Sequence, residues 1–210
     1  FNIVDGKVEE KPFASTALED SLTTSPAGFT NDGSTLYWID SRDRNTAALF
    51  AQDMKSGKRS MIAENAKADI GGTLRDPKTG VVEGYSVNYL KNEWTILDKD
   101  IADDWKLLDS KLEGDFGVQS RTDADDRWLI WNDPVTAPSV VYQFDRKTKD
   151  LKELYVGRPE LVGAPLVPMH SVEIKSRDGL TLPSYLTLPK SADANGDGKA
   201  DKAVPMVLFP

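Results

Sequence analysis

The loop from residue 193 to 201 of this 210-residue sequence carries residues whose types and spacing could hold a metal ion. Side-chain oxygens recur at alternate positions, and Gly198 stands where a calcium loop needs a sharp turn. Ca²⁺ prefers carboxylate, amide and backbone carbonyl oxygens. The sequence therefore predicts a structural Ca²⁺, and requires no other cofactor. The candidate ligands are Asp193, Asn195, Asp197, the carbonyl of Lys199, and Asp201.

The same loop has a simpler interpretation. An EF-hand loop carries a Glu at its twelfth position, where this sequence has Val204, and no helix pattern flanks the loop. Asp and Asn side chains also stabilise ordinary turns by accepting hydrogen bonds from nearby backbone amides. A polar turn between two strands therefore stays open as the alternative to a calcium site.

Nucleophilic catalysis has no support within this chain. A Ser-His-Asp triad needs a base beside the nucleophile and an acid that orients the base. The single histidine, His170, lies between Met169 and Ser171, and no Gly-x-Ser-x-Gly sequence occurs in the 210 residues. We therefore assign no catalytic residue to this chain and expect His170 to pack against its neighbours or face solvent.

Two groups of carboxylates, at 103–104 and 123–126, invite an acid–base interpretation. Glycosidases place two acids across a substrate, but here the acids fall at a helix start and in a hairpin turn, so we expect a solvated surface. The tryptophans are expected to pack in the core and between sheets, since no basic patch accompanies them for nucleic-acid binding. They are Trp38, Trp94, Trp105, Trp128 and Trp131.

Composition excludes several classes of protein. The net charge of -8 opposes binding to nucleic acid. The absence of cysteine excludes disulfide scaffolds and thiolate zinc sites. No apolar run approaches the roughly 20 residues that span a bilayer, so we expect no membrane partner. The hydrophobic content of 39% is sufficient for a packed core.

The elements that must position these residues are mainly short strands. A turn followed by strands recurs at 28–63, 74–97 and 122–156. A spacing of about 45 to 50 residues with several antiparallel strands in each copy is typical of propeller blades. The sequence therefore predicts about three blades of four-stranded antiparallel sheets. A β-sandwich is the alternative, but it does not explain the repeated order.

One helix interrupts the strands, at 98–109. Ile101, Trp105, Leu108 and Leu112 fall on a single stripe. Asp98 or Asp100 is suited to cap its N-terminus. We expect this helix to pack against a blade.

The pattern changes after residue 161. Residues 162–169 read as an extended linker, 171–176 and 180–189 as a two-stranded ribbon, and 204–209 as a buried-type strand. A chain that stops on its most apolar strand is expected to be part of a longer protein. The fold class is therefore mainly β, with a partial propeller followed by the first strands of a second domain.

Four segments, in this order along the chain, resemble the prolyl oligopeptidase family of serine peptidases. They are Arg158-Pro159-Glu160-Leu161, Pro168-Met169, the stretch from Ser176 to Pro189 (SRDGLTLPSYLTLP), and Val204-Pro205-Met206-Val207-Leu208-Phe209-Pro210. The resemblance covers the chain from about residue 28 onward, and the 177–189 segment is its most specific part. It is strongest to acylaminoacyl-peptidase and dipeptidyl-peptidase-like enzymes.

The resemblance implies a domain plan and a function. Residues 1–165 would be the C-terminal part of a β-propeller, and residues 166–210 the truncated start of an α/β-hydrolase domain. The parent protein would cleave oligopeptides near the N-terminus while the propeller gates substrate access. In relatives the nucleophile, acid, base and oxyanion loop lie further along the chain, so this chain alone would be inactive.

The resemblance also implies partners. These are a peptide substrate, the remaining blades and the hydrolase domain, with homo-oligomerisation as a further expectation. The calcium-like loop favours a periplasmic or secreted location over a cytoplasmic one. The alternative function is a non-catalytic propeller-type interaction module, which the sequence following residue 210 would distinguish.

Overall fold

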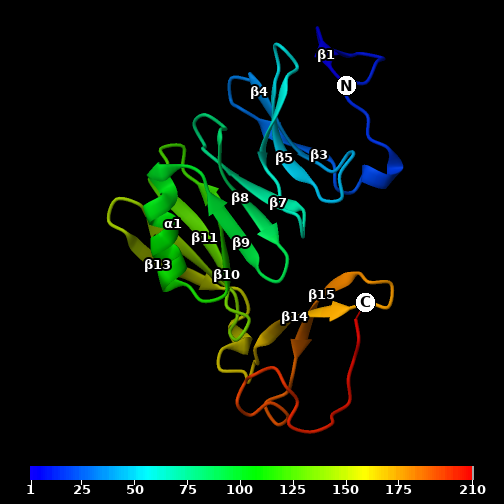
Figure 1. The fold of residues 1–210 in the computed structure, drawn as a ribbon. Coiled ribbons are helices and arrows are strands. Elements are labelled where there is room, and N and C mark those ends of the chain that lie inside the picture. Colours follow the sequence, from blue (N-terminus) through cyan, green and yellow to red (C-terminus); the bar gives the residue numbers. More distant parts are fainter. Residues whose placement is uncertain (210) are drawn as a thin grey trace. The chain divides into compact units, whose positions relative to one another are not determined.

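The computed structural model describes residues 1–209 as short antiparallel strands with a single α-helix among them (Figure 1). The chain divides into two units. The first comprises residues 1–75 and 79–88, and the second comprises residues 76–78 and 89–210. Each unit contains a four-stranded antiparallel sheet in which strands adjacent in sequence are also adjacent in the sheet.

The first unit contains a short hairpin, one 3-10 turn, a four-stranded sheet in the order β3-β4-β5-β6, and the antiparallel pair β7 and β8. Its elements are β1 (Ile3–Val4), β2 (Lys7–Val8), η1 (Leu18–Asp20), β3 (Ser25–Phe29), β4 (Thr35–Asp40), β5 (Ala48–Asp53), β6 (Arg59–Ala63), β7 (Ile70–Arg75) and β8 (Val82–Asn88).

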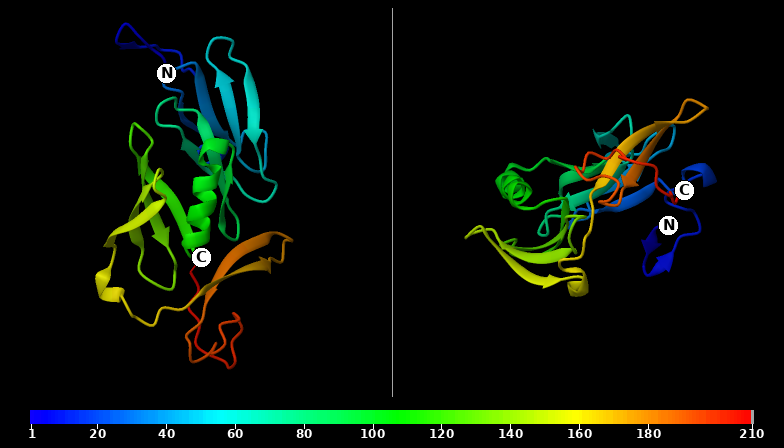
Figure 2. Two further views of the ribbon diagram at one scale, coloured as in Figure 1. Left: turned by 90° about the vertical axis from the view of Figure 1, so that its left-hand side faces the viewer. Right: turned by 90° about the horizontal axis from the view of Figure 1, so that it is seen from below.

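The second unit contains the α-helix, a four-stranded sheet in the order β10-β11-β12-β13, and a two-stranded ribbon. Its elements are β9 (Asn92–Ile96), α1 (Lys99–Lys111), β10 (Asp115–Arg121), β11 (Arg127–Asp133), β12 (Val140–Asp145), β13 (Asp150–Val156), η2 (Pro159–Leu161), β14 (Met169–Lys175) and β15 (Thr181–Thr187). The ribbon β14–β15 is drawn in yellow to orange in both views of Figure 2.

The two four-stranded sheets are copies of one design. Thr35 pairs with Asp53 in the first sheet, and Arg127 pairs with Asp145 in the second. Measured from these pairs, the register shifts of the two sheets fall at equivalent places, at 26/28 and 49/50 in one and at 118/120 and 141/142 in the other. Because bulges are specific structural features rather than random defects, the agreement confirms the repeat predicted from the sequence.

Alternation along the strands produces a core for each unit. In the first unit the buried cluster consists of Tyr37, Leu49, Ala63, Ile70 and Val82. In the second unit the fully buried side chains include Trp128, Ile130 and Phe144 on the sheet and Ile101 and Leu108 on α1. Side chains two apart on a strand share a face, so Trp128 and Ile130 point to the face that α1 covers.

Helix α1 follows the sequence prediction closely. The Asp98 carboxylate accepts a hydrogen bond from the Asp100 backbone N–H at 2.8 Å and caps the first turn. The predicted stripe is buried at Ile101, Trp105 and Leu108, while Leu112 lies at the C-cap. In residues 1–209, no helix combines the length and the apolar character that crossing a membrane requires.

The ribbon β14–β15 is also confirmed. Its register runs without interruption from Met169 opposite Thr187 to Lys175 opposite Thr181. The connecting turn uses Gly179 at φ +88°, a backbone conformation that glycine adopts at no steric cost. The mainly β fold class is therefore confirmed, while the domain boundary near residue 165 stays a prediction.

Two sequence expectations differ from the structure. The second repeat consists of β7, β8 and β9 followed by α1, rather than four strands. The strand expected at 204–209 is wrong, because these residues form no strand and Met206 to Phe209 are 77–87% exposed. A strand needs a partner for its backbone groups, and none of residues 1–209 pairs with this segment. Pro210 lies outside the described residues.

One type of turn occurs twice with glycine in the left-handed region, at Asp53–Gly57 and at Asp76–Gly80. The two glycines have φ of +70° and +72°. Their surroundings differ. A Cβ on Gly57 would meet nothing within 4 Å, whereas a Cβ on Gly80 would lie 2.8 Å from the Phe29 carbonyl oxygen. The second turn therefore packs its backbone directly on the segment that follows β3.

This difference predicts unequal effects of the same substitution. Gly57→Ala should destabilise by about 1 kcal/mol, the usual cost of a left-handed L-residue. Gly80→Ala should cost roughly 2–4 kcal/mol, because a fixed backbone oxygen must also move. Urea midpoints of the two variants in the full-length protein measure this. Equal midpoints would show that the turn at Gly80 shifts freely.

Candidate functional site

The acidic loop is organised around Asp193, whose side chain is 4% exposed. Its Oδ1 accepts the Asp197 backbone N–H at 3.0 Å, and its Oδ2 accepts the Gly198 backbone N–H at the same distance. The Asp193 backbone N–H in turn donates to the Pro189 carbonyl at 3.2 Å. This carboxylate therefore closes the loop on itself.

The other candidate ligands form similar local bonds. Asp197 accepts the Lys199 backbone N–H at 2.9 Å and the Asn195 amide at 3.1 Å, while Asp201 accepts the Ala194 backbone N–H at 3.2 Å. Within residues 1–209, no three His, Asp or Glu side chains are arranged to hold a metal ion. The hydrogen bonds match the turn alternative, and the calcium site stays a prediction.

His170 lies against this loop. Its Nε2 is 3.5 Å from Asp193 Oδ2, and its side chain is 23% exposed. A Cβ on Gly198 would be 2.8 Å from the imidazole Cγ, so the glycine backbone packs on the ring. His170 therefore has the packing role expected from the sequence and joins the loop to β14.

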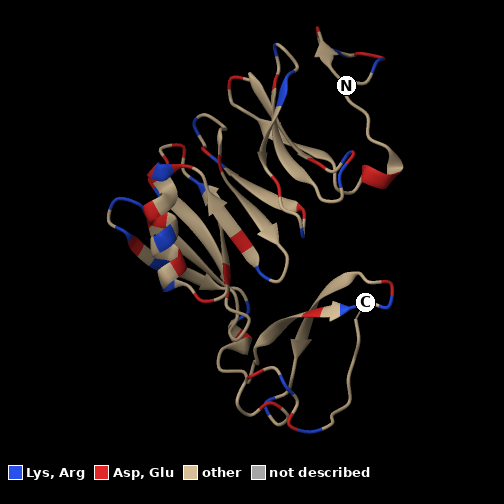
Figure 3. Ribbon diagram, in the orientation of Figure 1, with Lys and Arg blue, Asp and Glu red and all other residues tan. Residues whose placement is uncertain are grey.

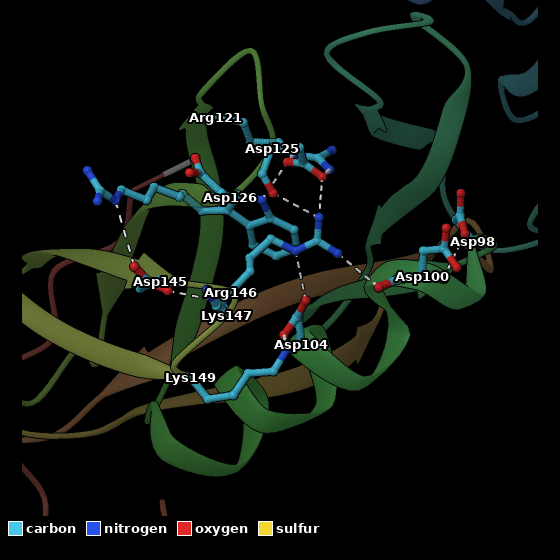
Figure 4. Close-up of polar contacts among 12 residues, drawn as sticks. Asp98, Asp100, Asp104, Arg121, Asp125, Asp126, Asp145, Arg146, Lys147 and Lys149 are labelled. Atoms are coloured by element: carbon cyan, nitrogen blue, oxygen red, sulfur yellow. Dashed lines mark hydrogen bonds and ion pairs between the residues drawn. The ribbon is translucent and has the colours of Figure 1, made fainter.

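A buried charge network joins α1 to the turns of the β10–β13 sheet in the second unit (Figure 4). Asp104 of α1 and Asp125 of the β10–β11 turn are 2% and 8% exposed. Arg146 bridges them: its Nε donates to Asp104 at 2.8 Å and its Nη1 donates to Asp125. Lys149 pairs with the other Asp104 oxygen, and Arg121 donates through Nε to Asp125 at 2.5 Å.

The expectation of a solvated carboxylate surface is therefore wrong for Asp104 and Asp125. Sequence spacing did not indicate that helix α1, strand β10 and two turns bring three cations to these two acids. The remaining acids of the two groups are exposed, as expected: Asp103, Asp123 and Asp126. Along the ribbon, many of the charged residues fall in turns and on α1 (Figure 3).

Trp128 completes the network. Its indole N–H donates to Asp125 Oδ1 at 2.7 Å. The guanidinium carbons of Arg121 and Arg146 lie 4.9 Å and 5.0 Å from the Trp128 ring centroid. At this range a cation is attracted to the ring. Trp105 and Trp128 pack in the core as expected, whereas Trp131 on the opposite face is 38% exposed.

Lys149 contributes to the network from a backbone conformation that is unusual for a residue other than glycine. This residue has φ +61° in a turn that resembles the one ending at Gly57. A non-glycine residue costs about 1 kcal/mol or more in the left-handed region. The Lys149 ammonium also provides a counter-charge for Asp104. The unfavourable backbone conformation of Lys149 is therefore offset by the ion pair that its side chain forms with the buried Asp104 carboxylate.

The first unit contains a smaller cluster of the same composition. Asp40 is 2% exposed and accepts hydrogen bonds from Arg42 and Arg59 at 2.5 and 2.6 Å. Burial acts to raise the pKa of the Asp40 carboxyl, but these bonds more than offset it and hold the pKa well below its usual value. Both guanidinium carbons lie 5.8 Å from the Trp38 ring centroid.

The chemistry available to these clusters is structural. Each oxygen of Asp104 and Asp125 already accepts from a cation or an indole of this chain, so neither carboxylate is free to act on a substrate. Sequence reasoning missed the arginines completely. The arginines also occupy different places in the two sheets, since Arg59 is the first residue of β6 whereas Arg146 directly follows β12, so their positions gave no shared sequence signal.

Comparison with known proteins gives the family context. No family model matches the chain. Over 203 residues, 97% of its length, the chain is 53% identical to a dipeptidyl aminopeptidase BIII from Pseudoxanthomonas mexicana. It is 24% identical over 177 residues, 83% of the chain, to dipeptidyl peptidase family member 6 from Caenorhabditis elegans. The chain spans only 29% and 24% of the lengths of these relatives.

Among solved structures, a post-proline cleaving enzyme from Rickettsia typhi aligns with 77% of the chain at 13% identity and a TM-score of 0.46. The alignment covers 25% of that structure. The sequence similarities confirm the predicted resemblance to the prolyl oligopeptidase family. Both relatives with similar sequences are named as dipeptidyl peptidases, and the similarity to the first extends over nearly the whole chain.

The charge network yields a prediction for stability. Asp104→Ala should destabilise the full-length protein by roughly 2–4 kcal/mol, because it leaves Arg146 partly buried beside one fewer acid. Its neighbour Asp103 is exposed on the same helix, so Asp103→Ala should change stability by less than about 0.5 kcal/mol. Urea denaturation followed by tryptophan fluorescence measures both. Matching midpoints would mean that the network contributes no net stability.

Proposed function

We propose that the protein containing this chain is a serine peptidase of the dipeptidyl-peptidase type, acting near the N-terminus of oligopeptides. The observation that supports this most is the 53% identity over 97% of the chain to a dipeptidyl aminopeptidase. Between the two types that the sequence left open, the names of both relatives favour dipeptidyl over acylaminoacyl cleavage.

In this proposal the chain contributes scaffold rather than chemistry. No Gly-x-Ser-x-Gly sequence is present. His170 contacts Asp193, but the hydroxyl of the adjacent Ser171 donates to the Leu90 carbonyl. The attacking serine, its base and the oxyanion donors would come from the remainder of the protein. The sheets β3–β6 and β10–β13 would form part of a wall that restricts access to that site.

The partners of the chain follow from the same proposal. Peptides would be the substrates of the whole protein, and further blades and a hydrolase domain would cover the apolar side chains that this chain exposes. Examples on the β10–β13 sheet are Trp131, Leu154 and Tyr155, which are 38–55% exposed. Exposed apolar surface of this kind favours association, which also agrees with homo-oligomerisation.

We also propose that the loop at 193–201 binds a structural Ca²⁺. Five oxygen-bearing groups lie within nine residues, and Asp193 and Asp197 already approach the same stretch of backbone. The site would be weak for two reasons. It lacks a bidentate Glu, and the positive charge of Lys199 lies within the loop. Millimolar Ca²⁺ is typical of extracellular calcium modules, so the proposal is consistent with a periplasmic or secreted location.

The proposed activity is tested with chromogenic substrates. The full-length protein should hydrolyse dipeptidyl p-nitroanilides with a free amino terminus in preference to their N-acetylated forms or to single aminoacyl anilides. A serine-directed phosphonate should abolish this activity. The 210-residue chain alone should show none, because it lacks the nucleophile. Turnover by the isolated chain, or preference for the blocked substrates, would contradict the proposal.

Calcium binding is tested by thermal melting. A bound ion should stabilise by about 2.7 kcal/mol at a hundred-fold excess over its dissociation constant, and Mg²⁺ should substitute poorly. Asp197→Ala should remove the effect. Asp178→Ala, in another Asp-Gly turn, is the matched control and should retain it. Identical melting midpoints in Ca²⁺ and in excess chelator would leave the loop a simple polar turn.

A further inference from the structure

Strand β14 is joined to the bend between β8 and β9 by two side-chain hydrogen bonds. The Ser171 hydroxyl donates to the Leu90 carbonyl at 2.6 Å. The Tyr89 hydroxyl donates to a Glu173 carboxylate oxygen at 2.8 Å. Each bond links residues more than 80 positions apart in the sequence, so both connect the ribbon β14–β15 to the 89–91 bend.

The two bonds act from the same side of the strand. Ser171 and Glu173 are two residues apart, so their side chains project from one face of β14. The pair is also chemically robust. The hydrogen bond to Glu173 raises the pKa of Tyr89 above its ordinary value of 10.0, so the phenol remains a donor throughout the neutral range.

The covalent connection to the ribbon is loose by comparison. Residues 157–168 contain no strand, only the three-residue turn η2. Gly163 has φ +79° with nothing within 4 Å of the position of its Cβ, and Val162 is 65% exposed. A segment with few packed side chains opens at low cost. The two hydrogen bonds therefore have a large share in holding the ribbon in place.

We propose that the Ser171–Leu90 and Tyr89–Glu173 hydrogen bonds form a latch, and that release of this latch admits longer peptides to the active site. The part of this inference that concerns peptide entry rests on the proposed function. The ribbon begins the segment that we assign to the catalytic domain, and the 89–91 bend belongs to the blade side. In this proposal Tyr89 and Ser171 act as positioning residues, because their hydroxyl groups bond to other groups of this chain.

The latch should work by a shift of populations. The closed state is favoured by two partly exposed hydrogen bonds, each of which contributes modestly. Removing one should increase the open fraction about five-fold, and removing both should increase it further. Substrates that fit through the closed protein would be unaffected, whereas longer peptides would be processed faster.

The experiment uses the full-length protein with Tyr89→Phe, Ser171→Ala and the double variant. Tyr155→Phe and Ser184→Ala are matched controls. Tyr155 is 55% exposed on β13, and the Ser184 hydroxyl bonds within the ribbon, to the Leu182 carbonyl. One readout is the rate of limited proteolysis in the 157–168 segment. The other is the ratio of kcat/KM for a ten-residue peptide to that for a dipeptidyl p-nitroanilide.

Each latch variant should raise the proteolysis rate and the kcat/KM ratio by roughly two- to ten-fold, and the controls should change neither. Proteolysis unchanged in the double variant would overturn the latch itself. Faster proteolysis with an unchanged ratio would overturn its role in substrate entry. If the unmodified protein cleaves no dipeptidyl substrate, the proposed function fails, while the proteolysis readout still decides whether the latch exists.

Discussion

The guanidinium of Arg146 is the contact on which the second unit depends. It donates to Asp104 of α1, to Asp125 of the β10–β11 turn, and to the Asp100 carbonyl at 2.9 Å. Arginine is suited to this because its rigid fork presents several donors in one plane. The contact holds a helix onto a sheet at the edge where two turns meet. The apolar packing of Trp105 on Phe116, with ring centroids 4.9 Å apart, can then form beneath it.

The two four-stranded sheets share a backbone arrangement but differ in the ion pairs that they carry. Both sheets have the same strand order, cross-strand pairs and bulges, which follow from local turn chemistry and alternation. The polar clusters on them are different in size, with two arginines around Asp40 and two arginines and a lysine around Asp104 and Asp125. The larger cluster belongs to the sheet that α1 covers. The two sheets therefore share strand order and register, while the charged residues around their buried carboxylates differ.

Much of the fold could be predicted from the sequence because it depends on short-range signals. Alternation and glycine turns located most strands, and the stripe of Ile101, Trp105 and Leu108 located the helix. The burial of Asp104 and Asp125 could not be predicted, because it depends on Arg146, more than 20 residues away from either acid. The prediction of a strand at 204–209 was wrong for a related reason. Its apolar residues favour a strand, but pairing depends on an edge that local sequence does not reveal. In the loop at 193–201, the spacing of the oxygen-bearing residues could be read from the sequence. The hydrogen bonds that Asp193 accepts from the loop backbone could not.

The positive φ of Lys149 has a consequence for how this region changes during evolution. Glycine would adopt that backbone conformation more easily, but it would deprive Asp104 of a counter-charge. Conversely, replacing Asp104 with an apolar residue removes the reason to retain a strained lysine. Substitution at either position alone is therefore costly, while a paired change is tolerable. The two positions, 45 residues apart in the chain, should consequently covary among homologous sequences, so that glycine in the turn accompanies loss of the acid on the helix.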